Sequence, residues 1–277
     1  MSETTDHTDA PVPMTDAQKF FFDLHGWILL PLVLDQEEVD ELKEEVYAGG
    51  NCGSGKLQTL LDHPAVVGIL TEILCEAPFA KEDCYGFRCE GFFNAVRQPE
   101  WSRSESRTDL PHVVRPPQQA NAMRYQVAGS KIFAGLTRVV WELEEVRAGQ
   151  GGTSFLTGSH KAHFNYGGPD RYAPNIGGSP WEQQMREAME SYSCPPGSVV
   201  IFTESLAHAS NDWTNPDNPR CAVFNCYNSI WAQWHKLSLE HEQIEAMPPK
   251  RRSLFRGTWA IGGPAGNSAY TLENRAV

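Results

Sequence analysis

The hydrophobic pattern of this chain changes near Tyr85, and that change constrains the possible folds more than any other feature. Before Tyr85, apolar residues recur at helical spacing, and the first two helical segments follow the capping residues Thr15 and Asp35. After Tyr85, short apolar runs such as residues 199–202 alternate with turns rich in glycine and proline. Helices followed by many short strands predict an α+β protein, mainly β, whose core is an antiparallel barrel or a two-sheet jelly roll.

The domain organisation follows from the absence of internal repeats and linkers in the sequence. We expect a single domain over residues 14–277. Residues 1–13 are polar and acidic, without the basic and apolar regions of a secretory signal, and we expect a disordered leader there. Residues 98–122 and 165–180 are predicted to be long loops that shape a pocket. The first helix is expected to have an apolar face made by three residues: Phe20, Phe21 and Leu24.

Charge and composition narrow the range of partners. The chain has 277 residues, with 23 Lys and Arg against 35 Asp and Glu, which gives a net charge of −12. Nucleic acids and anionic membranes need basic surface, so neither is predicted as a partner. No apolar run approaches the ~18 residues of a membrane span. A small molecule is the predicted partner.

The cysteines indicate the compartment. Seven cysteines, an odd number, are scattered without any CxxC pair. This usage favours a reducing cytoplasm over a disulfide framework, and it argues against a structural zinc site.

A histidine and an arginine carry the chemistry that the sequence predicts. His208 follows an apolar strand, and Arg220, 12 positions later (220 − 208), enters the next apolar run. Imidazole is a common ligand of iron, and a guanidinium binds a carboxylate through two parallel hydrogen bonds. The pair therefore suits a site that holds a metal together with an organic acid, although a loop histidine and a surface arginine would also explain it.

Several segments, in order, resemble the phytanoyl-CoA dioxygenase-like branch of the iron(II)/2-oxoglutarate oxygenases. The resemblance extends from Met14 to about Asn228. The matching segments are residues 20–31, 34–39, 60–66, 141–146, 151–161 with its Gly-Ser-His-Lys ending, 196–202, and the residues His208, Ser210 and Arg220.

This resemblance implies a fold, two cofactors and a set of site residues. The fold would be a double-stranded β-helix, a cupin-like jelly roll, with an N-terminal helical layer. Iron(II) would be held by two histidines and a carboxylate, with open positions for 2-oxoglutarate and oxygen. His208 would be the distal histidine, Arg220 and Ser210 would bind the far carboxylate of 2-oxoglutarate, and Trp141 would pack near that cosubstrate.

The first metal motif departs from the family pattern. The family has His-x-Asp, whereas the histidine in the corresponding window is His112, which is followed two positions later by Val114. In one reading His112 and His208 bind iron and Glu204 supplies the carboxylate, with two weaker candidates: Asp109 and Glu142. In a second reading a halide replaces the carboxylate, although valine leaves little space for it. In a third, the metal site has decayed and the protein binds a ligand without oxidising it.

The sequence therefore predicts a 2-oxoglutarate-dependent dioxygenase that hydroxylates a small organic substrate. The alternative is a non-catalytic or altered-site binding protein on the same fold. Arginines in and around the 98–122 loop, from Arg97 to Arg124, also offer a site for the phosphates of an acyl-CoA, but a solvated loop explains them better.

Overall fold

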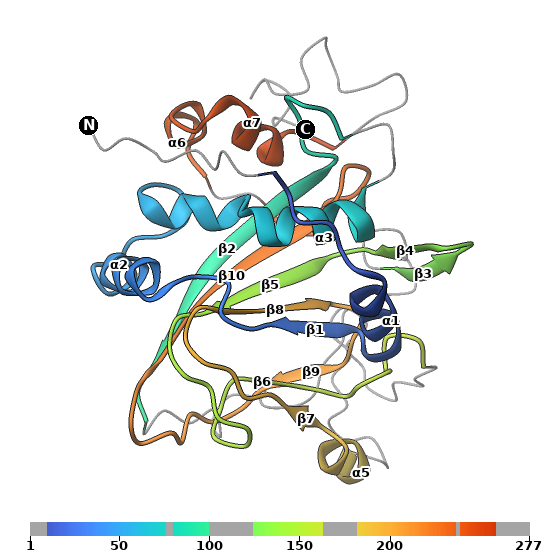
Figure 1. Cartoon of the computed structure of the whole chain (residues 1–277), viewed down its shortest axis with the longest axis vertical. Helices are drawn as coiled ribbons and strands as arrows, with labels where there is room; N and C mark the ends of the chain where they lie inside the picture. The colour runs from blue at the N-terminus through green and yellow to red at the C-terminus, as the bar shows by residue number, and fades with distance from the viewer. Residues whose placement is uncertain (1–9, 76–79, 100–123, 163–181, 237–238, 259–277) are drawn as a thin grey trace.

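The computed structural model describes residues 10–75, 80–99, 124–162, 182–236 and 239–258. In these parts the chain forms two antiparallel sheets, a separate hairpin and several helices (Figure 1). The mixed helical and antiparallel architecture confirms the predicted α+β class. Within the described ranges, no helix has the length and apolar character needed to cross a membrane.

The larger sheet has five strands in the order β1-β8-β5-β10-β2, and every neighbouring pair is antiparallel. Its strands are β1 (Trp27–Leu30), β2 (Phe87–Arg97), β5 (Thr137–Glu142), β8 (Ser198–Thr203) and β10 (Arg220–Ser229). Strands β8 and β10, which flank the central strand β5, are almost wholly buried. This burial explains why both read in the sequence as nearly continuous apolar runs.

The smaller sheet lies opposite the larger one (Figure 1). Its order is β7-β6-β9, with β6 (Thr153–Phe155), β7 (Glu190–Ser191) and β9 (His208–Ser210). A core cluster fills the space between the sheets, and Phe155 from the smaller sheet meets Phe202 from the larger with ring centroids 5.1 Å apart. The hairpin of β3 (Tyr125–Ala128) and β4 (Lys131–Ala134) extends to one side.

Helices cover the other face of the larger sheet. They are α1 (Asp16–His25), α2 (Gln36–Tyr47), a 3₁₀ helix (Lys56–Leu61) and α3 (Pro64–Leu74). Short helices α5 (Glu182–Glu187), α6 (His241–Glu245) and α7 (Pro249–Arg252) and a 3₁₀ turn (Ser253–Phe255) follow later in the chain. The caps predicted at Thr15 and Asp35 are both present as capping boxes. Gly68 in α3 lies directly against the Val12 carbonyl, where a side chain would collide, and Val12 donates to the Pro64 carbonyl at 3.0 Å.

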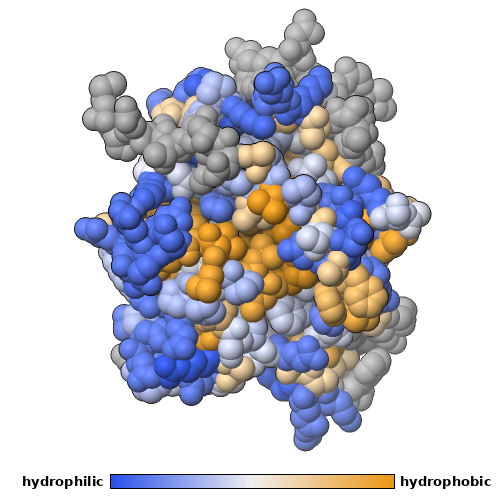
Figure 2. Space-filling model, in the orientation of Figure 1, coloured by the Kyte–Doolittle hydropathy of each residue, from blue (hydrophilic) through white to orange (hydrophobic). Residues whose placement is uncertain are grey.

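The outer face of α1 differs from a simple amphipathic pattern. Phe22 is its buried residue, whereas Phe20, Phe21 and Leu24 are 62%, 48% and 49% exposed. The apolar face expected from the sequence is therefore turned to the surface. In Figure 2, hydrophobic side chains gather across the middle of this side of the molecule, and hydrophilic ones border them.

Alternation along β5 assigns its side chains to two different cores. Val139 and Trp141 belong to the cluster that packs against the helices, and Val140 belongs to the cluster between the sheets. Because successive residues of a strand point to opposite faces, Arg138 and Glu142 share the inner face with Val140. Polar side chains at both ends of β5 therefore enter the space between the sheets, and these side chains form the site described next.

Candidate active site

His208 begins β9, directly opposite Phe155 of β6. Its side chain is buried, and its ring centroid lies 4.9 Å from that of Phe202. Ring atom Nδ1 is 2.8 Å from the Leu206 carbonyl oxygen. Because a carbonyl only accepts hydrogen bonds, this contact favours a proton on Nδ1, and in that tautomer Nε2 is the ring nitrogen that can bind a metal. The local fold thus sets the tautomer that a metal ligand requires.

Glu204 lies in the turn after β8, and its Oε2 is 3.7 Å from Nε2 of His208. With metal–ligand bonds of about 2.1 Å, one ion can contact two atoms that are up to about 4.2 Å apart. The other oxygen, Oε1, pairs with Nε of Arg138 on β5. Burial disfavours the charge of Arg138, but Cys226 and the Glu204 carboxylate outweigh burial, so the pKa of Arg138 is raised. Glu204 therefore has one oxygen toward the histidine and one held by an arginine.

Arg220 begins β10 and is completely buried, as predicted from its position before an apolar run. Its Nη2 donates to Oε1 of Glu142 at 2.5 Å, and its Nε donates to Oε2 at 3.4 Å. The Tyr192 hydroxyl donates to the same Oε1 at 2.6 Å. Burial and the Glu142 charge raise the pKa of Tyr192 well above its usual value. The carboxylate that faces Arg220 in the described structure is thus Glu142, a weaker candidate for the metal ligand in the sequence, which pairs here with the arginine.

One donor of Arg220 remains for a ligand. Its Nη1 is buried and has no hydrogen-bond partner among the described residues. Burial disfavours the charged guanidinium, but Glu142 and the other neighbouring groups together outweigh burial, and the pKa of Arg220 is raised. The side chain is therefore a permanent cation with a donor that a second carboxylate can satisfy.

Arg97 is not recognisable as a site residue from the sequence, where it stands next to the arginines of the 98–122 loop. It is the last residue of β2 and the register partner of Arg220. Its Nη2 lies 3.4 Å from Oγ of Ser210 on β9. Arg97 is identified as a site residue because it lies opposite Arg220 on the neighbouring strand, and this pairing is known only from the strand register.

Trp141 lies apart from this group. Trp141 packs on the helix side of β5, with its ring centroid 5.2 Å from that of His63. It does not share a face with Arg220 and Glu142, so the structure does not bring it together with the predicted cosubstrate residues. His112, Asp109 and Val114 lie outside the described residues.

Comparison with solved structures shows the same fold in known proteins. HygX from Streptomyces hygroscopicus with iron bound is 14% identical, with a TM-score of 0.60 over 85% of this chain and 95% of that chain. HygX with nickel, 2-oxoglutarate and hygromycin B bound gives 0.58 at 14% identity, over 82% and 92%. The non-heme α-ketoglutarate-dependent carbocyclase SnoK from nogalamycin biosynthesis gives 0.53 at 16% identity, over 87% and 96%.

Sequence comparison identifies the family. No curated protein sequence matches the chain. The family model described as phytanoyl-CoA dioxygenase (PhyH) matches residues 22–222, which include the larger sheet from β1 to the start of β10, together with His208, Ser210 and Arg220. The chain therefore belongs to the phytanoyl-CoA dioxygenase family of iron(II)- and 2-oxoglutarate-dependent oxygenases.

Proposed function

We propose that this oxygenase hydroxylates an unactivated C–H bond of a small organic substrate, inside a double-stranded β-helix formed by the two sheets. The observation that carries the proposal is the order of polar groups between the sheets. His208 and Glu204 lie at the level of Phe202, and the buried Arg220 donor lies near the other end of β5, beside Glu142. The four residue steps from Arg138 to Glu142 span about 13 Å of strand. The Arg220 side chain extends over the Phe224 ring, toward the end of β5 that holds Arg138.

The residues present suit the two cofactors. Nε2 of His208 and Oε2 of Glu204 are close enough for one iron ion, and His112 is the proposed second histidine. The buried Nη1 of Arg220 suits the far carboxylate of 2-oxoglutarate. When bound, iron(II) and 2-oxoglutarate together activate oxygen, with release of succinate and carbon dioxide.

The protein positions the acid and excludes water. Arg220 binds one carboxylate of the acid through Nη1 while Glu142 continues to balance its charge. Arg97 adds a second cation at the same level of the sheet, and Ser210 orients that guanidinium. Phe155 and the other aromatic side chains between the sheets keep the site dry, which strengthens each of these charge interactions.

The solved neighbours suggest the class of substrate. HygX has been solved with hygromycin B bound and SnoN with nogalamycin RO bound, and a small natural product is accordingly the proposed class of substrate.

All seven cysteines are buried and none forms a disulfide, which supports a reducing compartment such as the cytoplasm.

Anaerobic titration tests the proposal. Iron(II) added with 2-oxoglutarate should produce a weak visible metal-to-ligand charge-transfer band, and oxygen should then release succinate. His208→Ala should abolish both, and His241→Ala, which changes an exposed histidine on α6, should leave both intact. A wild-type protein with neither the band nor succinate would be a binding protein instead of an oxygenase.

A further inference from the structure

Three potential metal ligands converge at the far end of β2 and β10, and none of them belongs to the proposed iron site. They are Glu90, Cys226 and His235, whose ligand atoms all lie within 4.8 Å of one another. Glu90 is on β2, Cys226 is on β10, and His235 follows β10 in the chain.

A β-bulge brings the first two side chains together. Cys226 is the register partner of Gly91, but the next residue, Tyr227, pairs with Cys89. Glu90 is therefore the extra residue of the bulge, opposite no partner of its own. Bulges turn a side chain away from the regular alternation of a strand. Here the bulge allows the Glu90 carboxylate to meet the Cys226 thiol.

The two separations that involve His235 match a tetrahedral ion. His235 Nδ1 lies 3.8 Å from Sγ of Cys226 and 3.4 Å from Oε2 of Glu90. Zinc binds sulfur at about 2.3 Å and nitrogen or oxygen at about 2.0–2.2 Å, so tetrahedral angles require about 3.6 Å and about 3.4 Å for these two pairs. In the metal-free protein the same sulfur–nitrogen contact is a weak hydrogen bond.

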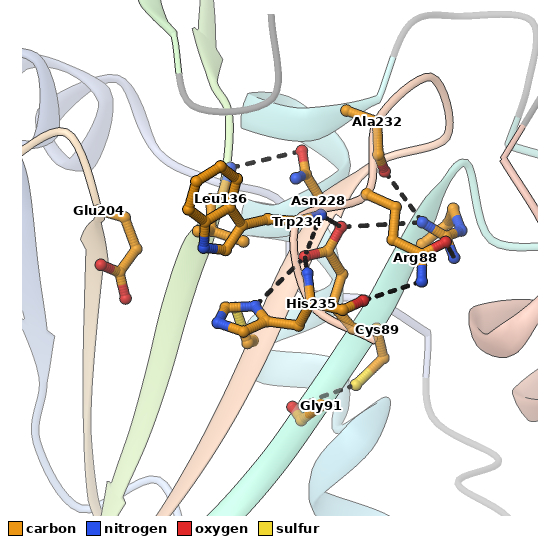
Figure 3. Close-up of polar contacts among 12 residues, drawn as sticks. Arg88, Cys89, Gly91, Leu136, Glu204, Asn228, Ala232, Trp234 and His235 are labelled. Atoms are coloured by element: carbon orange, nitrogen blue, oxygen red, sulfur yellow. Dashed lines mark hydrogen bonds and ion pairs between the residues drawn. The ribbon is translucent and has the colours of Figure 1, made fainter. Parts of the chain in front are cut away.

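Neighbouring groups hold the carboxylate in place. The backbone N–H of Trp234 is 3.0 Å from each oxygen of Glu90, and the N–H of His235 is 3.2 Å from Oε2 (Figure 3). Arg88 lies 3.8 Å from the other oxygen and is itself fixed by the Ala232 carbonyl at 2.9 Å. Such outer contacts orient metal ligands and leave lone pairs of the carboxylate for an ion.

The surroundings also allow an ion to enter and balance its charge. Glu90 and Cys226 are buried, whereas the His235 side chain is 37% exposed and opens the cluster to solvent. A thiolate and a carboxylate together neutralise a divalent cation. The cluster adjoins the proposed iron site through Arg138, which is the register partner of Cys226 and pairs with Glu204.

We propose that Glu90, Cys226 and His235 form a second metal site, which binds zinc(II) with three protein ligands and one open position. The thiolate of Cys226 favours zinc over iron(II) here, because the site proposed for iron has only histidine and carboxylate ligands. The sequence argued against structural zinc because it has no CxxC pair. That reasoning does not extend to an open site with a single cysteine, built from β2 and from β10 with the segment that follows it.

Cobalt(II) tests this site because it substitutes for zinc and reports a bound thiolate. Metal-free protein, titrated anaerobically, should bind cobalt with a near-ultraviolet thiolate-to-cobalt band, and added zinc should remove the band. Cys226→Ser should abolish the band, and His235→Gln should weaken cobalt binding at least about tenfold. His241→Gln is the matched control, because it changes another histidine exposed to solvent, and it should leave the titration unchanged.

The outcomes separate this site from the iron site. His208→Ala should lose the iron and 2-oxoglutarate band but keep the cobalt–thiolate band. If Cys226→Ser does not fold, the partly exposed His235→Gln variant provides the test by itself. Wild-type protein without a thiolate band, a band that survives Cys226→Ser, or binding unaffected by His235→Gln would overturn the proposal.

Discussion

The Glu142→Gln variant tests how the positive charge of the buried Arg220 is balanced. Glutamine keeps the shape and an acceptor oxygen but removes the charge that faces a completely buried guanidinium. Removing one partner of a buried ion pair lowers the free energy of unfolding by about 3–5 kcal/mol. Because glutamine retains a hydrogen bond, we expect about 3 kcal/mol, or about 6 °C in Tm for a chain of this size.

2-Oxoglutarate should reverse much of this loss. In the proposed site its far carboxylate binds Nη1 of Arg220, so it replaces the missing negative charge in Glu142→Gln. Saturation at 100 times Kd adds about 2.7 kcal/mol to any folded protein that binds the acid. The variant should bind more tightly than wild type and therefore gain more stability at the same concentration of acid.

The assay is urea unfolding of metal-free protein with and without 2-oxoglutarate. Glu142→Gln/Arg220→Met is the control, because it removes both charges; it should be more stable than Glu142→Gln and unaffected by the acid. Equal stabilisation of wild type and Glu142→Gln by 2-oxoglutarate would refute the assignment of Arg220 to the carboxylate.

Three other predictions concern single regions of the structure. Arg97→Met should raise the KM for 2-oxoglutarate at least about tenfold through loss of a charge-assisted hydrogen bond, measured by succinate release; an unchanged KM would remove Arg97 from the site. Trp141→Phe should lower the free energy of unfolding by about 2 kcal/mol. It should leave the affinity for 2-oxoglutarate unchanged, because Trp141 packs on the face of the larger sheet that the helices cover. A weaker affinity in calorimetric titration would show instead that Trp141 contacts 2-oxoglutarate. Burial raises the pKa of Cys89, Cys194 and Cys221 to about 12, from 9.0 in the unfolded chain. The contribution of these thiols to the free energy of unfolding is complete below pH 9. It is lost as the pH rises toward 12, by about 1.4 kcal/mol per pH unit for each thiol. Urea midpoints that stay constant over this range would contradict this prediction.

Local features of the fold could be predicted from the sequence because they depend on neighbouring residues. The capping boxes at Thr15 and Asp35 need only a side chain and a backbone three positions on. The strands around Val199 and after Arg220 are continuous apolar runs because both faces are buried. The burial of Arg220 followed from its place in such a run.

Features that depend on long-range register could not be predicted. Glu142 is 78 positions from Arg220, and only the pairing of β5 with β10 brings them together. Gly91 within β2 is a local sign of the bulge, but only the pairing of β2 with β10 places Glu90 beside Cys226. The side of Trp141 could have been inferred: it precedes Glu142 on the same strand, and alternation places neighbours on opposite faces.

A crystal structure with iron(II) and 2-oxoglutarate, grown without oxygen, tests the central claim most directly. Anomalous scattering at the iron edge should place the ion within bonding distance of Nε2 of His208, with the far carboxylate of 2-oxoglutarate against Nη1 of Arg220. Iron bound elsewhere, or an acid that does not contact Arg220, would contradict this account of the site.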